Sequence, residues 1–113
     1  MRYTLMFRDA EKAERSWQML SDSERDQAFE EVERWFSAHA AKITHSRRLK
    51  SHRSATTLRP REDSRPGMLD GPFCADRDAI GGYVEVDVSD LGEALDMVRG
   101  WPGHATVEIR PVM

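Results

Sequence analysis

Residues 82–101 decide the fold, and they read GYVEVDVSDLGEALDMVRGW. Apolar and charged side chains alternate over residues 82–88, which predicts a half-buried strand. Asp90 is followed three residues later by Glu93, and this pair is typical of the first turn of a helix. Apolar residues then recur at helical spacing from Leu91 to Trp101. The stretch therefore predicts a strand followed directly by an amphipathic helix.

The N-terminal half contains the same two signals in the same order. Residues 1–8 alternate between apolar and polar side chains, which predicts a strand with one buried face. Residues 9–20 are charged and irregular, and we expect no regular element there. Ser21 and Glu24 form a capping box, and the apolar residues behind it share one helical face. We therefore expect a helix over residues 22–41.

Three further strands complete the expected fold. We expect one strand in the second half of residues 43–60 and a short return strand at residues 68–70. Residues 61–67 between them read as a polar turn, and residues 106–112 form the last strand. When the strand in residues 43–60 and its return strand are counted together as one strand with a hairpin, the order of elements is the β-α-β-β-α-β pattern. The sequence thus predicts an α+β, ferredoxin-like sandwich with two helices on one face of an antiparallel sheet.

The composition is that of a small soluble protein. The chain suits a single domain, residues 1–113, with 39% hydrophobic and 33% charged residues. No apolar run has the length of a membrane span or a signal peptide, and the net charge of -3 argues against a general nucleic-acid binder. Cys74 is the only cysteine, so no internal disulfide can form. We therefore expect a cytoplasmic protein with no membrane or nucleic-acid partner.

Seven short motifs are spread over essentially the whole chain. In order, they are Met1-Arg2-Tyr3, Leu20-Ser21, Ala55-Thr56-Thr57, Asp70-Gly71-Pro72-Phe73, Gly81-Gly82-Tyr83, Asp90 to Ala94, and Val107 to Val112. In combination they resemble the YCII-related family, and within it the DGPF subfamily. The resemblance implies a dimeric α+β barrel, in which two ferredoxin-like sheets pack face to face and leave a cleft near the acid of the DGPF motif. It implies no established reaction, but some members occur beside or fused to extracytoplasmic-function sigma factors, which indicates a regulatory setting.

Two departures from the family pattern restrict what the resemblance implies about a site. After Phe73 the family usually has Ala-Glu-Thr-Lys-Glu, whereas residues 74–78 here read CADRD. The broader family has a histidine early in the first helix, proposed to pair with the acid of the motif, and residues 22–25 here contain none. A His–Asp pair of that kind is therefore not expected in this chain.

Asp70 is the first candidate site residue. The Gly71-Pro72 pair that follows it can continue neither a helix nor a central strand, so we expect a sharp bend at the end of a strand. A carboxylate fixed at such a bend can act as a general base or bind a cationic group. The alternative is an aspartate that only caps a turn through nearby N–H groups.

A second group of candidates shares the face of the sheet opposite the helices. The alternation places Tyr83, Glu108 and Arg110 on that face, and Glu85 lies there as well. The candidate ligand-binding residues are Phe73, Tyr83, Glu108 and Arg110. The alternative, which the cost of burying charge favours, is that Glu108 and Arg110 form a structural ion pair.

Other reactive residues carry weaker signals. Cys74 has acidic neighbours that disfavour its thiolate, so we expect a half-buried thiol rather than a nucleophile. The basic residues 45–53 lack interleaved aromatics, which favours a solvated strand edge over a nucleic-acid site. The histidines show no metal-ligand spacing, so we expect no metal and no cofactor. They are His39, His45, His52 and His104.

These observations predict a homodimer that binds an unidentified small organic molecule in a cleft near Asp70, with acid–base catalysis through its carboxylate. The dimer is expected because Tyr3, Met6 and the valine-rich strands present more apolar sheet surface than one small domain covers. The alternative is a non-catalytic regulatory or interaction module, for instance a partner of a transcription factor. A pocket that touches Asp70, with Tyr83 or Arg110 in reach, favours the enzyme, and a pocket-free interface favours the module.

Overall fold

The computed structural model describes residues 1–60, 67–71 and 79–113, and for Arg59 and residues 67–70 it describes the backbone alone. The candidate ligand-binding residue Phe73 and the thiol of Cys74 therefore lie outside the described residues. So does most of the expected polar turn that precedes β4.

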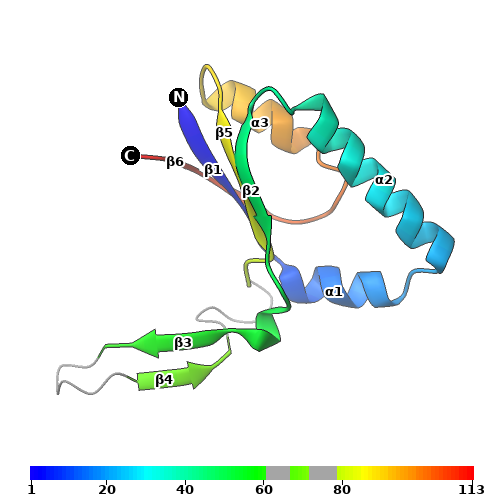
Figure 1. The fold of residues 1–113 in the computed structure, drawn as a ribbon, viewed down its shortest axis with the longest axis vertical. Helices are drawn as coiled ribbons and strands as arrows, with labels where there is room; N and C mark the ends of the chain where they lie inside the picture. Colours follow the sequence, from blue (N-terminus) through cyan, green and yellow to red (C-terminus); the bar gives the residue numbers. More distant parts are fainter. Residues whose placement is uncertain (61–66, 72–78) are drawn as a thin grey trace.

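A four-stranded antiparallel sheet forms the centre of the molecule, with the strand order β2-β5-β1-β6 (Figure 1). Its strands are β1 (Arg2–Phe7), β2 (Ile43–Arg48), β5 (Gly82–Asp87) and β6 (Val107–Pro111). The first strand is an inner strand that pairs with both β5 and β6, so the first and last strands of the chain lie side by side. The β5 strand predicted from its alternation is confirmed, and so are the first and last strands.

Three helices cover one face of this sheet (Figure 1). They are α1 (Ala10–Gln18), α2 (Asp22–Ala38) and α3 (Leu91–Arg99). The first two connect β1 to β2, and α3 connects β5 to β6. This α+β arrangement is compatible with a ferredoxin-like fold. No helix in the part of the chain that the structure describes is both long and apolar enough to cross a membrane.

The predicted starts of two helices are confirmed by their capping contacts. The Ser21 hydroxyl accepts from the Glu24 N–H at 3.2 Å, and the Ser21 N–H donates to the Glu24 carboxylate at 2.9 Å. The Asp90 carboxylate accepts from the Glu93 N–H at 2.9 Å. Such caps satisfy N–H groups that have no partner within the helix.

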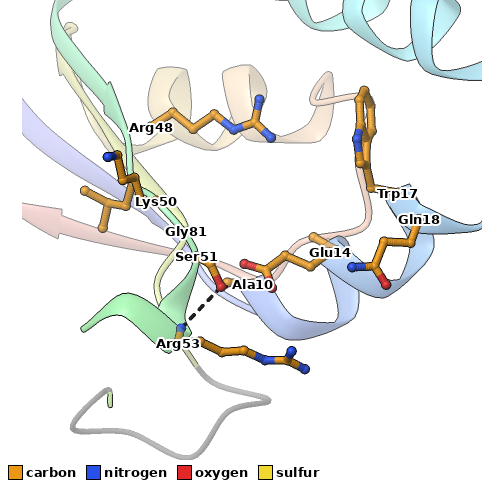
Figure 2. A pocket seen from close by; sticks show the side chains of 11 residues that line it. Ala10, Glu14, Trp17, Gln18, Arg48, Lys50, Ser51, Arg53 and Gly81 are labelled. Carbon is orange, nitrogen blue, oxygen red and sulfur yellow. Dashed lines mark hydrogen bonds between the residues drawn. The ribbon is translucent and has the colours of Figure 1, made fainter. Parts of the chain in front are cut away.

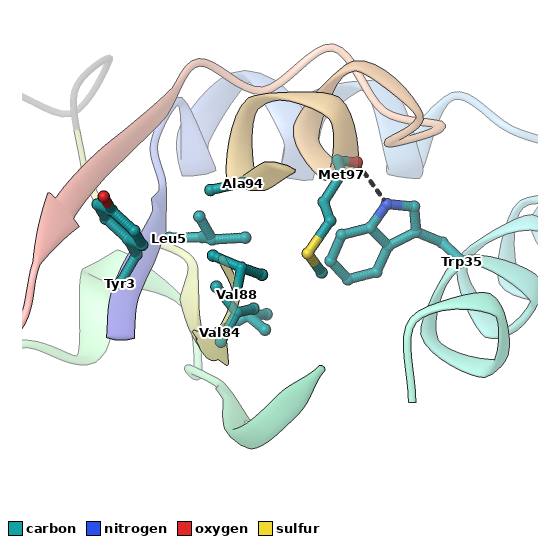
Figure 3. Close-up of a cluster of buried hydrophobic side chains, with 8 residues drawn as sticks. Tyr3, Leu5, Trp35, Val84, Val88, Ala94 and Met97 are labelled. Atoms are coloured by element: carbon teal, nitrogen blue, oxygen red, sulfur yellow. Dashed lines mark hydrogen bonds between the residues drawn. The ribbon is translucent and has the colours of Figure 1, made fainter. Parts of the chain in front are cut away.

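The core lies between the sheet and the helices (Figure 3). Inward side chains of β1 and β5 meet Ala94 and Met97 of α3 and Trp35 of α2. The indole Nε1 of Trp35 donates to the backbone carbonyl of Met97 at 2.8 Å, which ties the two helices together. The buried cluster comprises Tyr3, Leu5, Trp35, Val84, Val86, Val88, Ala94 and Met97.

A separate two-stranded antiparallel sheet is inserted between β2 and β5. It consists of β3 (Thr56–Arg59) and β4 (Gly67–Asp70), preceded by the 3-10 turn η1 (His52–Ser54). Figure 1 shows this hairpin projecting away from the main sheet and its helices. The radius of gyration is accordingly 16.2 Å, whereas a compact chain of this length has a value of about 13 Å.

Three sequence expectations need correction. The segment expected to be irregular contains α1, whose residues are mostly good helix formers although only Ala10 is buried. A strand was expected only in the second half of residues 43–60, but β2 occupies the first half and β3 the second. The helix α2 ends at Ala38 rather than at residue 41, and the described part of the chain contains three α-helices where two were expected.

The reason given for dimerisation also needs correction. Tyr3 and the inward valines of β5 are buried beneath the chain's own helices, so the expected excess of apolar sheet surface is absent. Met6 does lie on the uncovered face, where it is half-buried opposite Tyr83 and Glu108. That face is otherwise mainly polar, and we call it the open face.

Candidate functional site

A groove of about 450 Å³ lies where α1 passes the end of β2 (Figure 2). One wall belongs to α1, and the other belongs to the segment that leads from β2 into η1. The lining residues are Ala10, Ala13, Glu14, Trp17, Gln18, Arg48, Leu49, Lys50, Ser51, Arg53 and Gly81. We call this the α1 groove.

Local backbone contacts position the α1 wall. Asp9, which precedes the helix, has a left-handed φ of 64°, and its carboxylate accepts from the Thr106 N–H at 3.0 Å. This hydrogen bond is the main reason why the pKa of Asp9 is lowered. The Ala10 N–H donates to the Ala79 carbonyl at 3.1 Å, so the helix begins against the segment before β5.

Gly81 allows the two walls to approach each other. A Cβ at this position would lie 3.3 Å from the Cβ of Ala10, which is tighter than an ordinary contact. Its N–H donates to the Phe7 carbonyl at 2.9 Å, and its carbonyl accepts from the Leu49 N–H at 2.9 Å. Gly81 therefore links β1 to the segment that forms the second wall.

Glu14 brings a carboxylate into the groove, and this carboxylate contacts Ser51 and His52. Its Oε2 accepts from the Ser51 hydroxyl at 3.3 Å, and its Oε1 lies 3.5 Å from Nδ1 of His52. His52 is buried, with 5% of its surface exposed, whereas Glu14 is partly exposed. The Ser51 hydroxyl also accepts from the Arg53 N–H at 3.3 Å and so caps η1. A carboxylate backed by a buried imidazole is suited to proton transfer.

The bend expected after Asp70 lies beside η1. Asp70 is the last residue of β4 and is paired with Thr56 of β3. Gly71 has a φ of 126°, which side chains rarely adopt, and its N–H donates to the Ala55 carbonyl at 2.7 Å. The Gly71 carbonyl accepts from the Thr57 hydroxyl at 2.8 Å. The backbone at Asp70 is thus fixed next to the turn that carries His52, and the role of its carboxylate stays a prediction.

The remaining sequence candidates lie on the open face, on the other side of the sheet. The strand register places Tyr83 and Glu108 opposite Met6, and Arg110 opposite Thr4. The shared face predicted from the alternation is therefore confirmed. Neither Tyr83 nor Arg110 lines the α1 groove.

Glu108 forms the ion pair that was weighed against ligand binding. Its carboxylate accepts from the Arg8 guanidinium at 2.9 Å and from the guanidinium of Arg110. The hydrogen bond from Arg8 is the main reason why the pKa of Glu108 is lowered, and the charge of Arg110 contributes in the same direction. A carboxylate held between two guanidinium groups has a structural role whether or not a ligand binds nearby.

Sequence reasoning missed Glu14, His45 and His52 as members of a site. Nε2 of His45 lies 3.0 Å from the Tyr83 hydroxyl on the open face, but the strand that carries this histidine was not expected. Glu14 was overlooked because its helix was not expected either. Two signals were available: the sequence AEKAER at residues 10–15 is rich in helix-forming residues, and Ala10, Ala13 and Trp17 recur at helical spacing.

No family model matches the chain, and no curated protein matches it. Within residues 1–60, 67–71 and 79–113, no group of three or more His, Cys, Asp or Glu residues is placed to hold a metal ion.

Proposed function

We propose that this protein binds a small organic molecule in the α1 groove and performs acid–base chemistry on it through Glu14. The observation that carries the proposal is the position of the Glu14 carboxylate, which lines the groove while its Oε1 lies 3.5 Å from the buried His52. A hydrogen bond from Ser51 fixes the second oxygen of the same carboxylate.

The chemistry follows from this arrangement. Glu14 removes a proton from the bound molecule or returns one to it, because it is the acidic group that reaches the groove. His52 acts behind it as a positioning residue, because its buried imidazole lies against Oε1 of the carboxylate and orients it. In the proposal the carboxylate of Asp70 acts from the bend beside η1 as a second acid–base group.

The proposed assembly is a ferredoxin-like homodimer of the DGPF type, with the two open faces enclosing a barrel. The resemblance of the seven motifs supports this proposal. The projecting hairpin also supports it, because an isolated two-stranded hairpin has marginal stability in water and gains stability by packing on another chain.

The same hairpin favours a second candidate function, a non-catalytic interaction module. On this alternative, β3 and β4 bind a different protein, such as a transcription factor, and the α1 groove has no ligand. The two functions differ in whether the groove binds and transforms small molecules.

Proton exchange at carbon provides the test. We expect wild-type protein in D2O to catalyse deuterium uptake next to the carbonyl of at least one compound in a panel of small oxo acids and ketones, followed by proton NMR. Glu14→Gln should lower that rate by about 100-fold or more, the lower end of what a general acid–base group contributes. Asp70→Asn should lower the rate as well.

Glu11→Gln is the matched control, because Glu11 lies on the same helix, pairs with Arg15 and does not line the groove. This variant should retain the wild-type rate. Equal rates in the wild type, Glu14→Gln and Asp70→Asn would contradict the proposal, and an absence of exchange with every compound would favour the interaction module.

A further inference from the structure

The α1 groove contains three cationic side chains on the wall opposite α1. They are Arg48, Lys50 and Arg53, and all three are exposed. Figure 2 shows Arg48 and Arg53 extending toward α1, with Glu14 between them in this view. The positive charge therefore belongs to one wall and the carboxylate to the other.

The cations of this wall have no counter-charge among the residues that the structure describes. Each ion pair found there involves other cationic groups. Among the described residues that line the groove the acid is Glu14, and its two oxygens already face Ser51 and His52. A groove with several unpaired guanidinium and ammonium groups is suited to an anion.

The position of Arg48 argues against a purely protective role at the sheet edge. In the β2–β5 register Arg48 lies opposite Gly82, two residues along β2 from Ser46, which lies opposite the buried Val84. Arg48 therefore shares the helix-covered face of the sheet, while its neighbour Arg47 lies on the open face opposite Tyr83. Protection of the sheet edge against pairing with another strand does not explain why Arg48 faces the groove.

Trp17 supplies the groove with a fixed aromatic surface. Its ring contacts Phe29 edge-on at a centroid distance of 4.9 Å, and the guanidinium of Arg25 lies 5.6 Å from the ring centroid. These neighbours hold the indole in place while it lines the groove. A held aromatic ring beside cationic groups suits a planar or apolar body that carries an anionic group.

We infer that the ligand of the α1 groove is a small organic anion, with a carboxylate or phosphate bound by Arg48, which extends toward Trp17 in Figure 2, and an apolar body against Trp17. This inference rests on the proposed function, because it assigns the substrate class of the same groove. It also orients the molecule, since the anionic end lies toward the cationic wall and away from the negative charge of Glu14.

Three probes of similar shape test the inference by NMR titration of the labelled protein: benzoate, phenyl phosphate and neutral benzamide. We expect at least one anion to shift the Trp17 indole signal and the Ser51 amide signal, with an affinity at least about tenfold above that of benzamide. The tighter of the two anions then identifies the anionic group. Added salt should weaken binding of the anion and leave binding of benzamide unchanged.

Arg48→Gln should weaken binding of the anion by about tenfold without changing the affinity for benzamide. Arg47→Gln is the matched control, because it removes the same charge from the opposite face and should leave both affinities unchanged. Both arginines are exposed, and the amide spectra of the variants show directly whether the fold is intact.

The outcomes separate this inference from the function on which it rests. If benzamide binds in the groove as tightly as the anions, the anion inference is overturned while the groove remains a binding site. If none of the three probes shifts the groove signals, the anion inference is overturned, and the deuterium-exchange experiment decides separately whether the proposed function stands. Equal loss of anion binding in Arg47→Gln and Arg48→Gln would also overturn the inference, because charge alone would then explain the effect.

Discussion

At the scale of single residues, His39 shows how burial makes stability depend on pH. It lies just after α2 with its ring 5.1 Å from that of Trp35, and its Nδ1 is buried. Burial lowers the pKa of His39 from its usual value of 6.5, and the nearby charge of Lys42 lowers it further. The folded state therefore binds a proton at this residue less readily than the unfolded state does.

The sign of the effect on stability follows from that difference. Above pH 6.5 the imidazole is neutral in both states, so His39 causes no loss of stability. As the pH falls below 6.5, the unfolded chain takes up the proton first, and stability declines until the folded-state pKa is passed. When the pH is lowered from 7.5 to 5.5, we expect the urea midpoint of the wild type to fall relative to that of His39→Leu. A difference that stays constant over this range would contradict the assignment.

At the scale of elements, the hydrogen bond between α2 and α3 can be tested by a single substitution. The indole of Trp35 is 4% exposed, and its N–H reaches the Met97 carbonyl near the end of α3 at 2.8 Å. Trp35→Phe keeps an aromatic ring but removes this buried donor. We expect the free energy of unfolding to fall by about 1–3 kcal/mol, measured by urea denaturation.

Trp17→Phe is the matched control for this substitution. Trp17 is half-buried beside the α1 groove, and its indole N–H has no partner among the described residues. The free energy of unfolding of this control variant should fall by less than about 1 kcal/mol. If the free energy of unfolding falls equally in the two variants, the hydrogen bond between Trp35 and Met97 contributes little to stability.

The elements also show why sequence reasoning succeeded in some places and failed in others. The strand at Gly82–Asp87 and the helix after Asp90 were predictable because alternation and capping are local properties of the chain. In β2 the register shifts between Ile43 and His45, so the two-residue period is broken and the strand was missed. The helix α1 was missed because its apolar stripe is short and consists mostly of alanine, with Ala10, Ala13 and Trp17 at helical spacing and only Ala10 buried.

The same contrast explains the candidate site. The open-face position of Tyr83, Glu108 and Arg110 followed from alternation alone. The α1 groove could not be predicted, because it joins a missed helix to the end of a missed strand. The contact between Glu14 and His52 spans 38 residues along the chain, and no spacing rule brings such residues together.

At the scale of the whole molecule, the main sheet has two different faces. One face is covered by three helices and contains the core, and the α1 groove opens at its edge. The open face carries Glu108 between Arg8 and Arg110, and His45 beside Tyr83. We assign the chemistry to the groove and the proposed dimer contact to the open face, so the two roles use opposite sides of one sheet.

This division of roles is the central claim, and a crystal structure of the protein grown with benzoate tests it most directly. We expect density for the benzoate in the α1 groove, with its carboxylate at Arg48 and its ring against Trp17. Benzoate bound instead on the open face, between Tyr83 and Arg110, with the groove left without it, would contradict the account.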